Sequence, residues 1–461
     1  MNLEILDKLR SIVGEDWVIT DPSQMEEYVL DETPGPAVPE VPEGNVLVKP
    51  GSTEEISDIL SLAADGDIDV VPRGGGTGLC GGAIPITAGI ILSLERLNEI
   101  TDLDQDNMMV TCQAGATLES LFERLEEVKG LFFPPHPGDE GAQIGGLVAT
   151  NAGGARAVKY GVVRNYVKGI TAVLPTGQTL HLGGKVLKDN TGYDLLHLLI
   201  GSEGTLAVIT EVTLRLFPEP KQTATLVVPY PDRHQALESV PPILREGFLP
   251  LALEYVERDL VQKSADHLGK SWPADQGQAY LMFIVEASSE SHLYSKCEII
   301  SDLAEERGAL DILFAQSRKD QQNILDIRSN IYTALEADSA DILDVTVPPA
   351  SMRELMDRVD EIGREFDISI PMYGHAGDGN LHPHIPADLD SEAVEEVKER
   401  VYEAAQKLGG VITGEHGVGY SRVKNLAGSF PQHHLDLMRR IKKSFDSQGN
   451  LNPGKVVPPG D

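Results

Sequence analysis

The sequence has few cysteines and few aromatic residues for its length. Its 461 residues include only 3 Cys and 5% aromatic residues. Cys80, Cys112 and Cys297 lie far apart and form neither a CxxC pair nor the ligand run of an iron–sulfur cluster. We therefore expect no disulfide bond and no intrinsic cluster.

Basic residues and long apolar runs are also scarce. Lys and Arg total 38 against 72 Asp and Glu, which gives a formal net charge of −34 at pH 7. This charge repels nucleic-acid phosphates and anionic membranes. No apolar run approaches the ~18 residues of a membrane-spanning helix, and residues 1–16 lack the roughly 7–15-residue apolar core of a signal peptide. We expect a cytoplasmic protein, or one held at a membrane only through a partner.

The length and the local patterns predict more than one domain, since single cores stop growing near ~250–300 residues. The proline-rich stretch 31–44 predicts an extended surface connection. Ser52 with Glu55 forms a capping box before an amphipathic helix, and Thr117 can cap a second helix. Runs rich in β-formers predict a sheet from residues 68–71, 89–94, 108–114, 169–175 and 205–217.

The pattern changes after the Phe-Pro-Glu-Pro punctuation at 217–220. Beyond it, strands at 340–347 and 368–373 are separated by longer helical stretches such as 317–337 and 391–408. We predict an α+β protein with a first domain over 1–220 and a second over 221–420. The second would combine an antiparallel sheet with helices, and a C-terminal segment over 421–461 would return to the first.

Two glycine-rich segments flank the second predicted helix. Residues 73–82 (RGGGTGLCGG) contain a GxGxxG match, but Pro85 breaks any helix and a strand follows, so a Rossmann fold is excluded. The second segment covers 134–146 and 150–154. Either alone would suit tight turns. Together they favour a large cofactor whose diphosphate is held by backbone N–H groups.

Histidines gather in two further glycine-rich segments, YGHAGDGNLHPH at 373–384 and GEHGVG at 414–419. Imidazole and carboxylate ligands suit Zn, Mn, Fe or Co and can leave coordination positions open for substrate. The alternative is that these side chains only bond the backbone in tight turns, a role that suits Asp378 and Asn380. The spacing alone leaves both interpretations open.

In order along the chain, these motifs resemble the flavoproteins of the vanillyl-alcohol oxidase type, which share the FAD-binding PCMH-type domain. The resemblance is greatest to the group of the glycolate oxidase D-subunit, D-lactate dehydrogenase and D-2-hydroxyglutarate dehydrogenase. It spans nearly the whole chain. Its carriers are PRGGGTG at 72–78, PGD at 137–139, IGGLVATNAGG at 144–154, KYGVVRNYV at 159–167, IGSEGTL at 200–206, YGHAGDGNLH at 373–382, GEHGVG at 414–419 and LNPGK at 451–455.

The resemblance implies a two-part FAD domain, a substrate domain and a C-terminal segment packed on the FAD site. Relatives with covalently bound FAD carry His in the first glycine loop, where this chain has Thr77, so we expect non-covalent FAD, with His136 as the weaker candidate for a tether. The implied FAD-binding residues are Arg73, Gly74, Gly75, Gly76, Thr77, Gly78, Pro137, Gly138, Asp139, Gly145, Gly146, Asn151, Gly153, Gly154, Gly161, Ile209 and Asn452.

The resemblance also implies a metal-assisted reaction centre. His375, His382 and Glu415 match positions that bind a divalent metal in the family. We expect Zn in the first place and Mn, Fe or Co as the alternatives. His416 would take the hydroxyl proton, and Arg328 would bind the substrate carboxylate. Relatives that bind the second carboxylate of 2-hydroxyglutarate carry a lysine before the strand at 341–347. This chain has Ile342 and Leu343 there, which favours D-lactate or glycolate.

The expected function is therefore FAD-dependent, metal-assisted oxidation of a small D-2-hydroxy acid. The electrons would pass to an electron-transfer flavoprotein, an iron–sulfur subunit or a quinone, and a homodimer is a further expectation. Three alternatives stand beside it: a D-2-hydroxyglutarate dehydrogenase, a non-catalytic flavin-binding subunit of a glycolate oxidase complex, and an oxidase that uses O₂. The His and Glu residues argue against the non-catalytic subunit.

Overall fold

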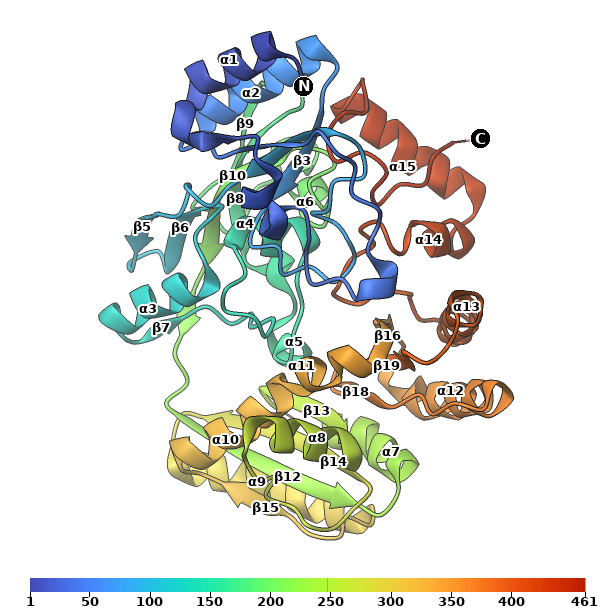
Figure 1. The fold of residues 1–461 in the computed structure, drawn as a ribbon. Coiled ribbons are helices and arrows are strands. Elements are labelled where there is room, and N and C mark those ends of the chain that lie inside the picture. Colours follow the sequence, from blue (N-terminus) through green and yellow to red (C-terminus); the bar gives the residue numbers. More distant parts are fainter. Residues whose placement is uncertain (247, 461) are drawn as a thin grey trace. The chain divides into compact units, whose positions relative to one another are not determined.

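The computed structural model describes residues 1–246 and 248–460 and divides into two compact units (Figure 1). Unit 1 comprises residues 1–152, 162–219 and 415–461. Unit 2 comprises residues 153–161 and 220–414. Within the described residues, no helix combines the length and apolar character needed to cross a membrane.

Unit 1 contains two sheets and a short ribbon. The first sheet has the order β1-β2-β4-β3, in which β2, β4 and β3 run parallel, and the second has the order β5-β6-β10-β8-β9 and is antiparallel throughout. Residues 74–88 join β3 to its parallel neighbour β4 without a helix, as expected for the first glycine-rich segment. The strands are β1 (Val18–Ile19), β2 (Val46–Val48), β3 (Asp69–Arg73), β4 (Gly89–Ser93), β5 (Ile100–Asp104), β6 (Met109–Gln113), β8 (Val167–Val173), β9 (Thr179–Gly183) and β10 (Val208–Arg215), with β7 (Leu131–Phe132) and β11 (Phe217–Pro218) in the ribbon.

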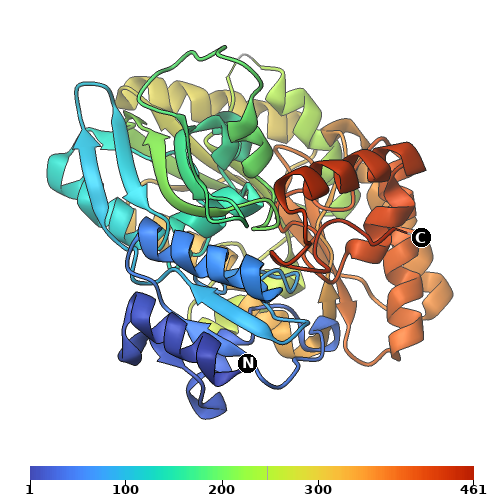
Figure 2. The ribbon, with the colours of Figure 1, turned by 90° about the horizontal axis from the view of Figure 1, so that it is seen from above.

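The helices of unit 1 begin where side chains can cap them. Helix α2 (Thr53–Gly66) starts at Ser52, whose Oγ accepts the Glu55 N–H at 3.2 Å, and the Glu55 carboxylate accepts the Gly51 N–H at 2.7 Å. Helix α1 (Leu3–Val13) packs beside it; both are blue in Figures 1 and 2. Helix α3 (Leu118–Val128) starts at Thr117, as expected. The remaining helices are α4 (Ile144–Thr150), α6 (Leu195–Leu199), α14 (Val423–Ser429) and α15 (Gln432–Phe445).

Two chain segments complete unit 1 by packing on its first sheet and loop. Residues 450–452 run beside β3, where Val70 N–H donates to Asn450 O at 2.8 Å and Asn452 N–H donates to Val70 O at 2.7 Å. The proline-rich stretch 31–44 lies largely at the surface, as the sequence predicts, but part of it is buried. Thr33, Pro34 and Pro39 are buried, because Thr33 Oγ1 accepts the Gly81 N–H and ties the stretch to the glycine loop.

Unit 2 is built on an eight-stranded sheet with the order β15-β12-β14-β13-β18-β19-β16, and β17 also pairs with β19. Every pairing in it is antiparallel. The strands are β12 (Gln222–Tyr230), β13 (Ala252–Glu257), β14 (Ala279–Ala287), β15 (Leu313–Ala315), β16 (Ser339–Ile342), β17 (Val345–Thr346), β18 (Met372–His375) and β19 (Asn380–Pro386).

Helices cover both faces of this sheet. Helices α7 (Arg233–Leu244) and α9 (Glu290–Glu306) pack on β12 and β14. Helices α8 (Arg258–Leu268), α10 (Arg318–Ser329) and α11 (Ile331–Leu335) share a core with the alternate side chains Tyr280 and Met282 of β14. The predicted single helix over 317–337 is interrupted at Asn330, between α10 and α11. Helices α5 (Ala157–Tyr160), α12 (Met352–Phe366) and α13 (Ser391–Lys407) complete the unit, and the predicted α+β class is confirmed.

Candidate functional site

The two glycine-rich segments of unit 1 lie against each other. A Cβ atom added to Gly74 would lie 3.8 Å from the Gly146 Cα, and one added to Gly75 would lie 3.2 Å from the Gly141 carbonyl oxygen. At Gly138 and Gly146, by contrast, an added Cβ would meet no atom within 4 Å. The segments therefore approach closely through their backbones and leave open space beside them.

Gln143 lies between these segments and carries an unused acceptor. A Cβ added to Gly74 would lie 3.6 Å from the Gln143 Oε1, which is buried without a hydrogen-bond partner among the described residues. A buried acceptor of this kind normally has a partner. Close backbones, open space and an unused acceptor together fit a bound dinucleotide cofactor.

Arg73 takes a different place from its glycine neighbours. Its side chain is buried, and its two Nη atoms donate to the backbone carbonyls of Leu30 and Glu27. The guanidinium therefore anchors the preceding segment and also lies against the loop, since a Cβ added to Gly76 would lie 2.7 Å from the Arg73 Cζ.

The C-terminal motifs meet the first glycine loop inside unit 1. Asn452 Nδ2 donates to the carbonyls of Gly82 at 3.0 Å and Glu203 at 2.9 Å. Lys455 donates to the Ile84 carbonyl, and burial lowers the pKa of Lys455 to about 8. Gly419 comes so close to Cys80 that an added Cβ would lie 2.1 Å from the Cys80 carbonyl oxygen. Residues 415–419 and 451–455 are thus both held at this loop.

Glu203 joins the same region, although the sequence did not single it out. Its carboxylate accepts the backbone N–H groups of Val418 at 2.8 Å and Gly419 at 2.7 Å. Burial raises the pKa of Glu203. Its position within the IGSEGTL motif was the available indication, because a carboxylate between glycines often bonds backbone N–H groups.

Several of the expected FAD-binding residues have structural contacts of their own. Asn151 Oδ1 accepts the Arg164 N–H at 3.0 Å, and Asp139 Oδ1 accepts the Gly141 N–H at 2.7 Å. The His136 ring stacks on Phe122. Of the remaining expected residues, Gly76, Thr77, Gly78, Pro137, Gly145 and Ile209 lie in unit 1, and Gly153, Gly154 and Gly161 lie in unit 2.

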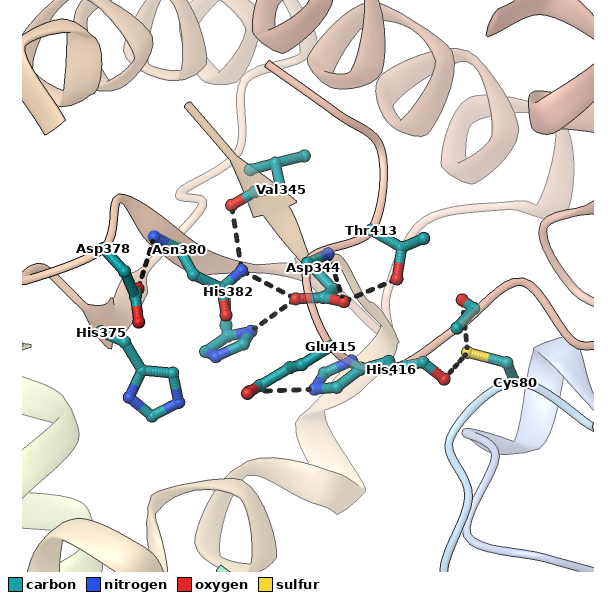
Figure 3. A network of polar contacts seen from close by, with 12 residues as sticks. Cys80, Asp344, Val345, His375, Asp378, Asn380, His382, Thr413, Glu415 and His416 are labelled. Carbon is teal, nitrogen blue, oxygen red and sulfur yellow. Dashed lines mark hydrogen bonds and ion pairs between the residues drawn. The ribbon is translucent and has the colours of Figure 1, made fainter. Parts of the chain in front are cut away.

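The histidine-rich segment forms a hairpin in unit 2. His375 ends β18 and His382 lies on the paired strand β19, with their ring centroids 5.5 Å apart and nearly perpendicular. Both side chains are buried. The hairpin therefore brings two of the expected metal ligands together, as Figure 3 shows.

Arg328 and Glu254 flank His375. Glu254, on β13, lies 2.8 Å from the His375 Nδ1 through Oε1 and forms an ion pair with Arg328. Burial alone would raise the pKa of the Glu254 carboxyl, but the charge of Arg328 and the bond from His375 hold it below its ordinary value. The Arg328 guanidinium also lies 4.9 Å from the centre of the Tyr373 ring. Its Nε is buried without a partner among the described residues.

Asp344 is a second buried carboxylate that the sequence did not single out. It accepts Asn380 Nδ2 at 2.8 Å, Thr413 Oγ1 at 2.7 Å and the Gly414 N–H at 2.9 Å (Figure 3). Its Oδ1 lies 3.8 Å from the His382 Nδ1. Asp344 thus fixes the chain directly before Glu415.

Glu415 and His416 are the first residues of the returning segment of unit 1. Glu415 Oε1 lies 3.9 Å from His416 Nε2, and the His416 carbonyl accepts the Cys80 thiol at 3.4 Å (Figure 3). Arg422 Nη1 donates to the Cys80 sulfur at 2.6 Å. Imidazoles and carboxylates of this kind are suitable ligands for a divalent metal and suitable groups for proton transfer.

Comparison with known proteins agrees with these features. Residues 45–183 match the family model of an FAD binding domain, and residues 219–456 match that of the C-terminal domain of FAD linked oxidases. A D-lactate dehydrogenase of Archaeoglobus fulgidus is 43% identical over 93% of this chain and 95% of its own length. The glycolate oxidase subunit GlcD of Bacillus subtilis is 35% identical over 89% of this chain and 88% of its own.

Solved structures share the fold at low identity. p-Cresol methylhydroxylase with substrate bound matches 99% of this chain and 96% of its own, with a TM-score of 0.79 and 16% identity. The 4-ethylphenol oxidase of Gulosibacter chungangensis gives a TM-score of 0.79 at 17% identity, over 99% and 97%. On the evidence of the two family models and the relatives at 35% and 43% identity, the chain belongs to the family of FAD-linked oxidases and is an FAD-binding oxidoreductase.

Proposed function

We propose that the protein oxidises a small D-2-hydroxy acid, D-lactate or glycolate, to the 2-oxo acid with non-covalent FAD and a divalent metal. Two relatives named D-lactate dehydrogenase, at 43% and 38% identity, and one named as a glycolate oxidase subunit support this substrate class. The first glycine loop carries Thr77 and no histidine, which supports dissociable FAD.

The observation that carries the proposal is the pair of buried imidazoles on the β18–β19 hairpin. His375 and His382 supply nitrogen ligands, and the chain held by Asp344 at Gly414 continues directly into Glu415 and His416. We assign His375, His382 and Glu415 as metal ligands, preferably of Zn. Two imidazoles and one carboxylate leave positions for a substrate hydroxyl and carboxylate.

The side chains then have separate tasks in the reaction. Arg328 attracts the substrate carboxylate, and its fork geometry suits a planar anion. His416 accepts the hydroxyl proton while a hydride leaves the substrate Cα. When bound, FAD supplies the two-electron acceptor for that hydride. A divalent ion would lower the pKa of the substrate hydroxyl and so ease the proton transfer to His416.

The surroundings of residue 343 support a monocarboxylate substrate. Leu343 is fully buried, and residues 339–347 contain no lysine. The buried Lys398, which pairs with Asp341 at 2.8 Å, belongs to α13 and not to this strand. A second substrate carboxylate would lack a basic partner from this strand.

The electrons must leave the flavin for another molecule. The three cysteines are each buried and lie far apart in the sequence, so they do not form the ligand run of an iron–sulfur cluster. We propose an electron-transfer flavoprotein, an iron–sulfur subunit or a quinone as acceptor, and a homodimer as the assembly.

Anaerobic flavin reduction tests the proposal. The purified yellow protein is mixed with D-lactate, L-lactate, glycolate or D-2-hydroxyglutarate, with and without EDTA, and the flavin absorption band is followed. We expect bleaching by D-lactate or glycolate that EDTA abolishes and added Zn²⁺ restores. Bleaching only by D-2-hydroxyglutarate would refute the substrate assignment. Bound flavin that no hydroxy acid reduces would instead indicate a non-catalytic flavin-binding subunit.

A further inference from the structure

Glu254 is a buried carboxylate to which the proposed reaction assigns no task. It lies on β13, inside the eight-stranded sheet, between β14 and β18. Its exposed fraction is 1%, and its chain neighbours Leu253 and Tyr255 are fully buried apolar residues. Placing a charge in such a strand is costly unless the charge has partners.

The strand register explains why Glu254 meets His375. In the antiparallel pairing of β13 with β18, Tyr255 lies opposite Gly374, so the next position places Glu254 opposite His375. The two carboxylate oxygens lie 2.8 and 3.0 Å from the His375 Nδ1. Both residues of this pair thus belong to paired strands, whose backbones hold the two side chains in contact.

The chemistry of this contact determines the histidine tautomer. An ionised carboxylate only accepts hydrogen bonds, so the His375 Nδ1 must carry the proton. In the neutral imidazole the lone pair then lies on Nε2. Arg328 forms an ion pair with the same carboxylate, which keeps Glu254 from being an unpaired buried charge.

We infer that Glu254 is a positioning residue of the metal site, which fixes His375 in the tautomer and orientation that present Nε2 to the divalent ion. The inference rests on the proposed function, since it takes His375 as a ligand. Carboxylates that accept the second N–H of a ligating histidine orient the ring and raise its basicity. Replacing such a group typically weakens metal affinity by roughly 10–100-fold.

Zinc affinity of the flavin-loaded protein tests this inference. Metal is removed with a chelator, and Zn²⁺ affinity is measured by competition with a chromophoric chelator in wild type, Glu254→Gln and His375→Ala. We expect Glu254→Gln to weaken zinc binding by about 10–100-fold and His375→Ala to weaken it further. Bound FAD, read from its absorption, should stay at one per chain.

Two comparisons separate positioning from general destabilisation. Asp341→Asn removes another buried carboxylate of unit 2, the partner of Lys398, and should leave zinc affinity unchanged. Because Glu254→Gln leaves Arg328 without its partner, the change is repeated in an Arg328→Met background, where the same loss of affinity is expected. Equal zinc affinity with and without Glu254 would overturn the inference alone. A wild-type protein that binds no divalent ion would overturn both the inference and the metal part of the proposed function.

Discussion

Glu257 couples the stability of unit 2 to pH through a single side chain. Burial raises the pKa of Glu257 to about 7, although Arg233 lies 3.1 Å away and the Tyr255 hydroxyl donates to it. The folded state therefore keeps a proton that the unfolded chain loses near its ordinary value of 4.5. Because the native state binds more protons in this window, the free energy of unfolding falls as pH rises from about 4.5 to 7.

Glu257→Gln should remove that dependence. Between pH 5 and pH 8 we expect the unfolding free energy of the variant to gain about 2–3 kcal/mol relative to wild type. Urea unfolding of both proteins at the two pH values measures this. Glu305→Gln, an exposed change on α9, should keep the wild-type profile. The prediction would be contradicted if the difference in unfolding free energy between Glu257→Gln and wild type were the same at pH 5 and pH 8.

The buried carboxylate of Asp344 leads to a second prediction at the residue scale. Asp344→Asn keeps the size of the side chain. The carboxylate oxygen that accepts the Thr413 hydroxyl and the Gly414 N–H becomes either an amide NH₂, which cannot accept, or an uncharged amide oxygen, which accepts more weakly. We expect a loss of about 1–3 kcal/mol in unfolding free energy and weaker flavin reduction by substrate, since the chain before Glu415 is released. Asp378→Asn in the neighbouring turn is the matched control. Full activity and stability of Asp344→Asn would show that the contacts are dispensable.

At the scale of elements, caps and turns define where helices begin. Ser52→Ala should cost about 1 kcal/mol because the Glu55 N–H at the start of α2 loses its acceptor. Thermal or urea unfolding measures the difference. Asp65→Ala, at an exposed position near the other end of α2, should not destabilise the protein. A Ser52→Ala variant as stable as wild type would show that tertiary packing alone fixes this helix.

The sequence predicted those helices and strands that are determined by residues close to them in the chain. The caps at Ser52 and Thr117 and the strand at 89–94 follow from neighbouring residues, and the structure has them. Part of the stretch 31–44 is buried where Thr33 bonds Gly81, 48 residues away, a contact that no local pattern contains. The break at Asn330 likewise arises where α11 packs against α8.

The candidate site likewise contains some residues that the sequence identified and others that it did not. Glycine and histidine motifs identified the loops because their residue types are unusual in a short stretch. Glu254 and Asp344 were missed, since each is a carboxylate in a largely apolar run and its partners are distant in sequence. Glu254 is 121 residues from His375, and Asp344 is 70 residues from Gly414. A charged residue within a run such as LALEYVE was the only available indication.

At the scale of the whole molecule, the net charge of −34 is a source of self-repulsion. Salt shortens the Debye length from ~30 Å at about 0.01 M to ~3 Å at about 1 M, which weakens this repulsion more than it weakens buried ion pairs. We expect the unfolding temperature to rise by several degrees over that range of NaCl, as measured by calorimetry. KCl should act equally, because the effect depends on ionic strength. A fall in unfolding temperature with salt would mean that surface ion pairs outweigh the repulsion.

The pairing of residues 450–452 with β3 has a consequence for the order in which the molecule can be made. Unit 1 is assembled from three separated stretches of chain, and its parallel sheet gains its last neighbour only when Asn450 and Asn452 reach Val70. On the ribosome, unit 2 is fully synthesised once Gly414 has emerged, whereas the N-terminal sheet must wait for residues made some 380 positions later than β3. A shortened chain that ends before residue 450 would therefore leave β3 without this neighbour and open to proteases, although all of unit 2 has been made.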